Sequence, residues 1–253
     1  PLFVRTRRSV ALTGAARLML PDVQSALQLI YRAIDERAAA PSSKTLTISV
    51  APSFASKWLL PRLSEFTERH PEIDLRISAT VSLADFGRDG TDFAIRFGRG
   101  DYPDLQAQKL FSESLTPLCS PRLRSARGLR RPDDLRRFRL LHDTSVPGAG
   151  EPNAWACWLR AAGARQVPAD SGLSFTLAEH ALQAAIDGAG VVLGRLGLAE
   201  GDLDAGRLVR PFKLAIPLDV GYFLVTPRRK RERAEIQCFR EWIMEAVSRT
   251  ALA

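Results

Sequence analysis

Cysteine, histidine and long apolar runs are scarce in this sequence of 253 residues, and each scarcity narrows what the protein can be. The cysteines, Cys119, Cys157 and Cys238, are odd in number and far apart, which matches neither a disulfide framework nor a metal-binding motif. Such thiols are typical of a reducing compartment, so we expect a cytoplasmic protein. No apolar run approaches the roughly 20 residues that a membrane-spanning helix needs. We also find no secretory signal and expect no membrane partner.

Motifs of catalysis are also missing from the sequence. It contains no G-x-S-x-G nucleophile elbow, no P-loop and no dinucleotide-binding fingerprint. His70 precedes a proline and His180 falls inside a predicted helix, and neither belongs to an evident catalytic triad or metal site. We therefore expect a protein that is not an enzyme and that has no cofactor.

Positive charge is what the sequence has in excess. Lysine and arginine number 36 against 28 acidic residues, and all but five of the 36 are arginines. This balance suits an anionic partner, either nucleic acid or an acidic small molecule, although arginine-rich codon usage accounts for it equally well. Residues 121–139 alone hold eight arginines against Asp133 and Asp134, and Arg228–Arg233 is a second basic cluster. Neither has the interleaved aromatic residues of a groove for single-stranded nucleic acid.

The first 43 residues predict a hairpin, a long helix and a hinge. Leu2–Val4 and Val10–Leu12 are short β-like runs on either side of basic residues, which indicates a hairpin with a cationic tip. Residues 41–43 have the composition of a hinge. The helix predicted between them has apolar residues at heptad spacing, which favours pairing with a second helix, while packing on its own domain stays open. The seam is formed by Leu20, Val23, Leu27, Ile30 and Ile34.

From Thr45 onward, short β-rich runs alternate with helical patterns, which is typical of βαβ units and a mostly parallel sheet. A helix is expected from Ser53 to about His70, and a closing helix over Lys230–Arg249 should return to the first unit. The pattern predicts two such sheets joined by two crossing strands, with a ligand cleft between them. Strands are expected at Thr45–Ala51, Asp74–Thr80, Asp92–Phe97, Gln106–Phe111, Leu115–Cys119, Arg139–His142, Leu173–Leu177, Gly190–Gly194, Leu208–Phe212 and Tyr222–Thr226.

Several segments, in this order along the chain, resemble LysR-type transcriptional regulators, in particular the subgroup with the glycine-cleavage activator and the β-lactamase regulator. The hairpin and heptad helix are similar to the wing and linker helix of that family. The string after the wing reads Leu12–Ala16, with alanine where the family usually has glycine. Similarity to the family's effector-binding domain is carried by Ser53–Ala55, Trp58–Leu63, His70–Leu75, Asp92–Gly100, Leu118–Pro121, Gly190–Arg195 and Leu203–Phe212.

The resemblance implies an α/β fold of two Rossmann-like subdomains of the periplasmic-binding-protein type, joined by two crossover strands and preceded by a wing remnant and a linker helix. It implies a wing at residues 1–17, a linker and hinge at 18–43, and an effector-binding domain at 44–253. Within that domain, lobe I comprises residues 44–117 and 221–253, and lobe II comprises 118–220.

The resemblance also implies a homodimer or homotetramer that binds a small effector. Most of the winged helix-turn-helix would precede Pro1, so specific DNA binding is expected of the full-length protein only, while Arg5, Arg7 and Arg8 could contact phosphates. The alternative, a solute-binding protein of a transporter, would need export, and the heptad helix and basic hairpin argue against it.

Residues at strand ends are the candidates for the effector site. Ser53 opens a helix whose free N–H groups suit a carboxylate or phosphate, although it can simply cap that helix. Thr80 and Ser82 end a strand on the same rim. Arg96 is a charge within a buried strand, where it either binds an acidic effector or pairs with Asp85 or Asp92. The apolar neighbours Phe54 and Phe97 complete this side of the site.

The second lobe should contribute the opposite wall. His142, next to Asp143, is either a ligand contact or a structural histidine. Tyr222 either donates a hydrogen bond into the cleft or packs as a hinge aromatic. The remaining candidates on this rim are Phe175, Thr176 and Arg195. The basic lining favours an anionic effector.

Overall fold

A computed structural model of the chain describes residues 2–5, 10–20, 22–23, 26–27, 30, 44–82, 86, 90–145, 154–228 and 233–250. The N-terminal hairpin is confirmed: β1 (Phe3–Arg5) pairs antiparallel with β2 (Val10–Leu12). Residues 14–20 and the described positions up to 30 are helical. Arg7, Arg8, Ile34, Asp85 and the expected hinge at 41–43 lie outside the described residues.

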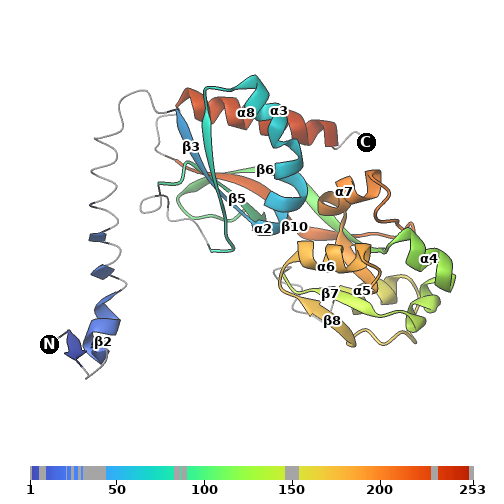
Figure 1. Cartoon of the computed structure of the whole chain (residues 1–253). Helices are drawn as coiled ribbons and strands as arrows, with labels where there is room; N and C mark the ends of the chain where they lie inside the picture. The colour runs from blue at the N-terminus through green and yellow to red at the C-terminus, as the bar shows by residue number, and fades with distance from the viewer. Residues whose placement is uncertain are drawn as a thin grey trace.

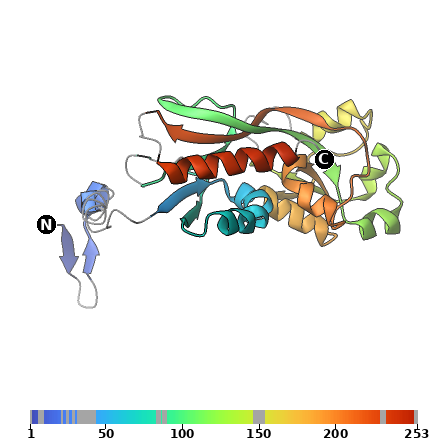
Figure 2. The same ribbon diagram turned by 90° about the horizontal axis from the view of Figure 1, so that it is seen from above.

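The rest of the described chain is organised around one eight-stranded sheet in the order β4-β3-β5-β10-β6-β9-β7-β8. Figures 1 and 2 show that helices cover it in two separate groups. One group belongs to the half of the sheet with β3, β4 and β5, and the other to the half with β7, β8 and β9. The strands are β3 (Thr45–Val50), β4 (Asp74–Ala79), β5 (Phe93–Gly98), β6 (Leu105–Leu118), β7 (Leu140–Asp143), β8 (Gly172–Phe175), β9 (Val191–Arg195) and β10 (Ile216–Pro227).

Three expectations about the strands were wrong. The runs 106–111 and 115–119 belong to one strand, β6, because Ser112-Glu113-Ser114 continues the ladder instead of turning. The strands form one sheet instead of the two expected. β3 pairs parallel with β4 and β5, and β7 parallel with β8 and β9, as expected, while the antiparallel strands β10 and β6 join the two parallel sets. The predicted strand at 208–212 is a single bridge between Val209 and Cys119.

The first half of the sheet packs against a helical segment and the last helix. The segment consists of α2 (Pro52–Phe54), η1 (Ala55–Leu59), η2 (Leu60–Arg62) and α3 (Leu63–Arg69). It departs from α-helical bonding just before Pro61, which has no N–H to donate. The last helix, α8 (Ala234–Thr250), returns to this half as expected. The ring of its Trp242 lies 5.2 Å from that of Phe66 in α3, so the two helices share one core.

The second half of the sheet has its own buried cluster, which includes Trp155, Trp158, Leu135 and Phe138. The indole N–H groups of the two tryptophans donate to the carbonyl oxygens of Leu141 and Leu214, so both rings are buried without loss of their hydrogen bonds. Its helices are α4 (Pro121–Arg127), η3 (Pro132–Arg137), α5 (Ala154–Ala161), α6 (Ala178–Ile186) and α7 (Leu196–Asp204). Among the described helices, none is long and apolar enough to cross a membrane.

Gly190 fixes the approach of β9 to β7. A Cβ atom at this buried position would lie 2.3 Å from the carbonyl oxygen of Arg139, which accepts a hydrogen bond from the Val191 N–H. Gly190→Ala should therefore force the two strands apart and lower the free energy of unfolding by about 1–3 kcal/mol.

Urea denaturation measures this effect, and Gly201→Ala is the matched control. Gly201 lies exposed in α7 with nothing within 4 Å of a Cβ atom. Alanine there should raise the free energy of unfolding by about 0.5–1 kcal/mol, because it reduces the conformational freedom of the unfolded chain. Equal changes in the free energy of unfolding for the two substitutions would contradict the claim that Gly190 lets β9 lie close to β7.

Candidate effector site

A cavity of about 180 Å³ lies where the two halves of the sheet meet. It is located at the carboxyl ends of β3, β5 and β9, beside β10, which is where ligands collect in open α/β sheets. No acidic side chain is among its described lining residues, which are Ala51, Pro52, Ser53, Thr80, Val81, Arg96, Phe97, Ser145, Leu177, Arg195 and Tyr222.

Arg195, at the end of β9, is the centre of the polar network around this cavity. Its guanidinium is 3% exposed and donates to the Tyr222 hydroxyl at 3.0 Å and to Ser145 Oγ at 2.7 Å. The same group lies 3.0 Å from the carboxylate of Asp143 and 4.4 Å from the centroid of the Phe97 ring. One buried cation therefore connects β9 with β7, β10 and β5.

The surroundings of Arg195 keep it charged. Burial alone would lower its pKa, but the acidic groups of Tyr222, Asp143 and Glu113 outweigh burial and raise the pKa above the ordinary value. Burial raises the pKa of Tyr222, so its hydroxyl stays protonated. The Nε atom of Arg195 is buried and has no hydrogen-bond partner among the described residues.

Arg96 is a second buried cation, and its described partners are all neutral. Its guanidinium donates to the Ser49 carbonyl and hydroxyl oxygens, to the Ile95 carbonyl oxygen, and to the Ser82 carbonyl oxygen at 2.9 Å. The expected partner Asp92 instead forms an ion pair with Arg233 at 2.9 Å. Burial lowers the pKa of Arg96. A fixed positive charge to which no described carboxylate is bound therefore lines the cavity.

Two helix N-termini also meet at the cavity. The helical segment that begins at Pro52 follows β3, and α6 begins at Ala178, directly after the lining residue Leu177. The Ser53 hydroxyl accepts a hydrogen bond from the Glu179 N–H at 3.3 Å, which holds the two ends together. The first N–H groups of a helix have no partner within it and carry partial positive charge. Both ends therefore add to the positive potential that the arginines create.

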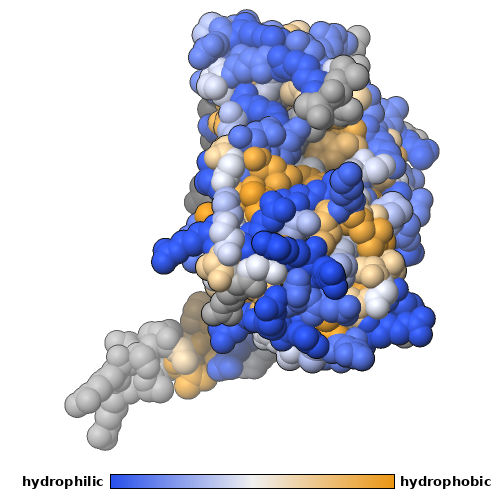
Figure 3. All heavy atoms as spheres, turned by 90° about the vertical axis from the view of Figure 1, so that its right-hand side faces the viewer, coloured by the Kyte–Doolittle hydropathy of each residue, from blue (hydrophilic) through white to orange (hydrophobic). Residues whose placement is uncertain are grey.

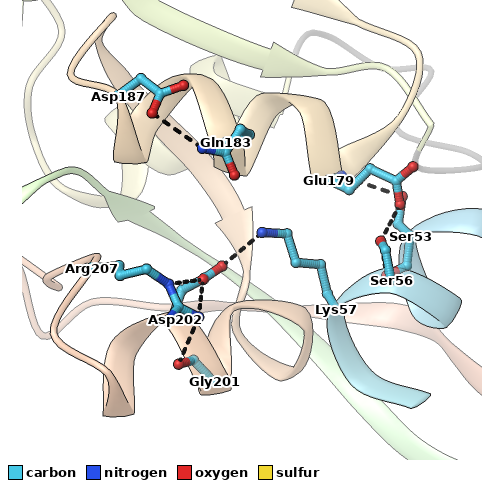
Figure 4. Close-up of polar contacts among 9 residues, drawn as sticks. All are labelled: Ser53, Ser56, Lys57, Glu179, Gln183, Asp187, Gly201, Asp202 and Arg207. Carbon is cyan, nitrogen blue, oxygen red and sulfur yellow. Dashed lines mark hydrogen bonds and ion pairs between the residues drawn. The ribbon is translucent and has the colours of Figure 1, made fainter. Parts of the chain in front are cut away.

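Polar contacts beside the cavity join the first helical segment to α6 and α7 (Figure 4). Lys57 reaches Asp202 at 3.0 Å, and Ser56 donates to the Glu179 carboxylate. Arg62 pairs with Glu200 at 2.7 Å. These contacts, which we call the polar bridge, connect helices that belong to opposite halves of the sheet.

Glu113, in the middle of β6, lies behind Arg195 and is 2% exposed. One carboxylate oxygen accepts the Gly197 N–H at 2.9 Å, at the start of α7, and the other has no hydrogen-bond partner in the described part of the chain. Burial raises the pKa of this carboxyl to about 7, although the Gly197 N–H and Arg195 act in the opposite direction. This side chain titrates near neutral pH inside the network.

Six of the residues expected in the effector site line the cavity together, although they come from five separate parts of the sequence. Ser82 lies at its edge and holds Arg96 through its carbonyl oxygen. Phe54 is buried behind the cavity, with its ring 4.7 Å from that of Tyr222. The six that line the cavity are Ser53, Thr80, Arg96, Phe97, Arg195 and Tyr222.

The other expected residues lie elsewhere. His142 does not line the cavity, because alternate residues of a strand point to opposite faces and Asp143 faces Arg195. A ring nitrogen of His142 contacts the Ser171 carbonyl oxygen at 3.2 Å. Phe175 is half-buried and Thr176 exposed, and neither is in the lining. Of the hairpin arginines, Arg5 is described only as part of β1.

Sequence reasoning did not single out Glu113, Ser145 or the polar bridge. Glu113 is the only charged residue between two apolar runs of the sequence, and this position could have identified it as a buried functional group. Ser145 and Lys57 follow no pattern, because their roles depend on contacts between residues more than 25 positions apart, such as Ser145 with Arg195 and Lys57 with Asp202.

Residues 39–248 match the family model of the LysR substrate binding domain. The glycine cleavage system transcriptional activator of Escherichia coli (strain K12) is 36% identical over 244 residues, which are 96% of this chain and 78% of that protein. The HTH-type transcriptional activator AmpR of Rhodobacter capsulatus is 33% identical over 243 residues, 96% of this chain and 80% of that protein.

Solved structures give the same result. The effector domain of the transcriptional regulator AmpR of Pseudomonas aeruginosa superposes with a TM-score of 0.67 at 32% identity, covering 83% of this chain and all 100% of that one. CrgA, a LysR-type transcriptional regulator from Neisseria meningitidis, has a TM-score of 0.62 at 21% identity and covers 98% of this chain and 84% of its own, which supports the fold alone.

The raised pKa of Glu113 predicts a pH dependence of stability. Between the ordinary pKa of 4.5 and about 7, the folded protein binds more protons at this site than the unfolded chain does. Stability should therefore fall as pH rises through this interval, by about 3 kcal/mol at most. Glu113→Gln, which cannot ionise, should be more stable than the wild type at pH 8 and nearly equal to it at pH 5.

Urea denaturation of both proteins at several pH values measures the difference. Glu241→Gln is the control, because it removes one carboxylate at an exposed position of α8 outside the Arg195 network. Parallel stability curves for the wild type and Glu113→Gln would show that Glu113 does not titrate in this interval.

Proposed function

The chain belongs to the LysR family of transcriptional regulators, and from this premise we propose that its cavity binds a small anionic effector that controls a DNA-binding head. The chain holds the effector-binding domain of such a regulator. The family match favours this function over that of a transporter's solute-binding protein, and the relatives it matches are regulators, not enzymes.

Positive charge converges on the cavity, and this observation is the main support for the proposal. Arg96 and Arg195 line it together with the starts of two helices, and its described lining contains no acidic side chain. Asp143, a carboxylate of the network beside the cavity, is already paired with Arg195. A carboxylate or phosphate would satisfy the unused N–H groups, whereas a cation would have to displace existing contacts. Ser53 and Tyr222 offer hydroxyl groups that would orient the anion.

Signal transmission would use the two halves of the sheet as lobes. We assign lobe I to residues 44–117 and 221–253 and lobe II to residues 118–220, with β6 and β10 as the crossover strands between them. The polar bridge joins the lobes beside the cavity, so an effector that binds one lobe arrangement more tightly shifts the equilibrium toward it.

Residues 18–43 would pass this change to the head, with residues 1–17 as the end of the wing. Leu20, Val23, Leu27 and Ile30 are 37–56% exposed in the single chain. An exposed apolar seam of this spacing is covered when two such helices pair. The protein would therefore act in the cytoplasm as a homodimer or homotetramer, and in the full-length protein Arg5, Arg7 and Arg8 would contact DNA phosphates.

Replacing Arg96 should weaken the binding of an anionic effector. A thermal-shift screen of carboxylates, amino acids and phosphorylated metabolites would supply a ligand, and calorimetry would measure its affinity. We expect Arg96→Gln to raise the dissociation constant about 10- to 100-fold, as for loss of one charge-assisted contact. Ser53→Ala should raise it by a smaller factor.

Arg99→Gln is the matched control, because Arg99 directly follows β5, the strand that contains Arg96, but pairs with Asp219 on the surface. Its affinity should equal that of the wild type. Unchanged affinity in both Arg96→Gln and Ser53→Ala, or preferential binding of cations by the wild type, would contradict the proposed site.

A further inference from the structure

Most of the net charge of the chain lies in one short segment. Residues 121–139, here called the arginine segment, contain eight arginines and two aspartates, a net charge of +6 out of +8 for the whole chain. The remaining 234 residues are nearly balanced, with 28 basic and 26 acidic residues. Arginine-rich codon usage replaces lysine by arginine throughout a sequence, but it does not concentrate net charge in one place.

The fold does not neutralise this charge. Asp134 accepts hydrogen bonds from the backbone N–H groups of Arg130 and Arg131 and pairs with Arg137 at 2.8 Å. Within the part of the chain that the structure describes, six further arginines of the segment are exposed and have no ion pair. They are Arg122, Arg124, Arg130, Arg131, Arg136 and Arg139.

A hollow of about 490 Å³ lies beside the arginine segment. Arg136, Arg137 and Arg139 form part of its lining, and small residues such as Gly172, Gly188 and Gly190 form much of the rest. The hollow is at the amino ends of β7, β8 and β9, opposite the effector cavity at the carboxyl ends. Figure 3 shows the end of the molecule that carries α4, where hydrophilic residues cover much of the surface.

We propose that the arginine segment and this hollow form a second DNA-contact surface, which binds the phosphate backbone of duplex DNA without reading its sequence. Phosphate contacts need unpaired positive charge and supply position rather than specificity. The small residues leave room for a sugar-phosphate ridge to approach the arginines. This surface is separate from the effector cavity, so the inference does not depend on the proposed effector.

The apolar residues of the segment favour DNA over an acidic protein. Leu129, Leu135 and Phe138 are buried, and Leu123 is half-buried, so the described segment exposes no large apolar side chain. Binding energy between proteins concentrates in aromatic and aliphatic anchors at the centre of an interface. This segment offers charge without such an anchor, which matches the needs of a phosphate backbone.

The test measures the binding of the chain to a short duplex of random sequence by fluorescence anisotropy over a range of KCl concentrations. Two quadruple variants are compared, both in an Arg5→Gln, Arg7→Gln, Arg8→Gln background that removes the hairpin charges. The first changes Arg122, Arg124, Arg136 and Arg139 to glutamine. The control changes Arg76, Arg99, Arg160 and Arg165, which are exposed arginines elsewhere, and so loses the same net charge.

The segment variant should bind the duplex at least about tenfold more weakly than the background protein at low salt. Its plot of log affinity against log salt should be shallower by about 0.9 for each phosphate that the substituted arginines no longer neutralise. The control variant should keep most of the affinity and the slope. Circular dichroism melting curves should overlap, because the substituted side chains of the segment form no ion pairs with other described residues.

Three results would overturn the proposal. Equal losses in the two quadruple variants would show that only total charge matters. Unchanged binding in the segment variant would show that DNA does not contact this surface. Retained DNA binding with loss of binding to a polyglutamate peptide, measured in the same way, would assign the surface to an acidic protein instead.

Discussion

The buried guanidinium of Arg195 is the interaction on which the rest of the site depends. A charge removed from water is costly unless it is paired and hydrogen-bonded, and here the partners come from three other strands. Tyr222 brings β10, Asp143 brings β7, and the Phe97 ring brings β5 to the same cation. The two halves of the sheet are thereby joined at the point where their strands end. Any ligand that enters the cavity meets a charge whose orientation is already fixed.

The pairing of the buried charges also explains why the site is positive overall. Asp143 balances Arg195, but Arg96 has only neutral described partners, and two helix starts face the same space. The excess charge is therefore part of the folded architecture before any ligand binds, which reduces the cost of organising the site on binding. The second concentration of charge, in residues 121–139, lies at the opposite ends of the strands. One domain would then carry two anion-binding surfaces of different chemistry, one enclosed and one open.

Sequence reasoning recovered those parts of the site that depend on local rules. Ser53 after a strand, and Arg96 inside an apolar run, are visible because helix starts and buried charges have known consequences. The predictions failed where contacts with residues distant in the sequence override the local sequence pattern. Ser112-Glu113-Ser114 has the composition of a turn, yet Glu113 continues β6 because Gly197 and Arg195 lie against it. The sequence leaves His142 open as a ligand contact or a structural histidine; in the structure it contacts the Ser171 carbonyl oxygen, and its neighbour Asp143, on the opposite face of β7, pairs with Arg195.

The most direct measurement of the central claim is a crystal structure of the chain with an anionic ligand from the screen. We expect the acidic group of the ligand in the cavity between Ser53 and Leu177. It should lie within hydrogen-bond distance of a hydroxyl or guanidinium group of Ser53, Arg96, Arg195 or Tyr222. A ligand bound outside this cavity, with the Arg195 network unchanged and the cavity empty at saturating concentration, would contradict it.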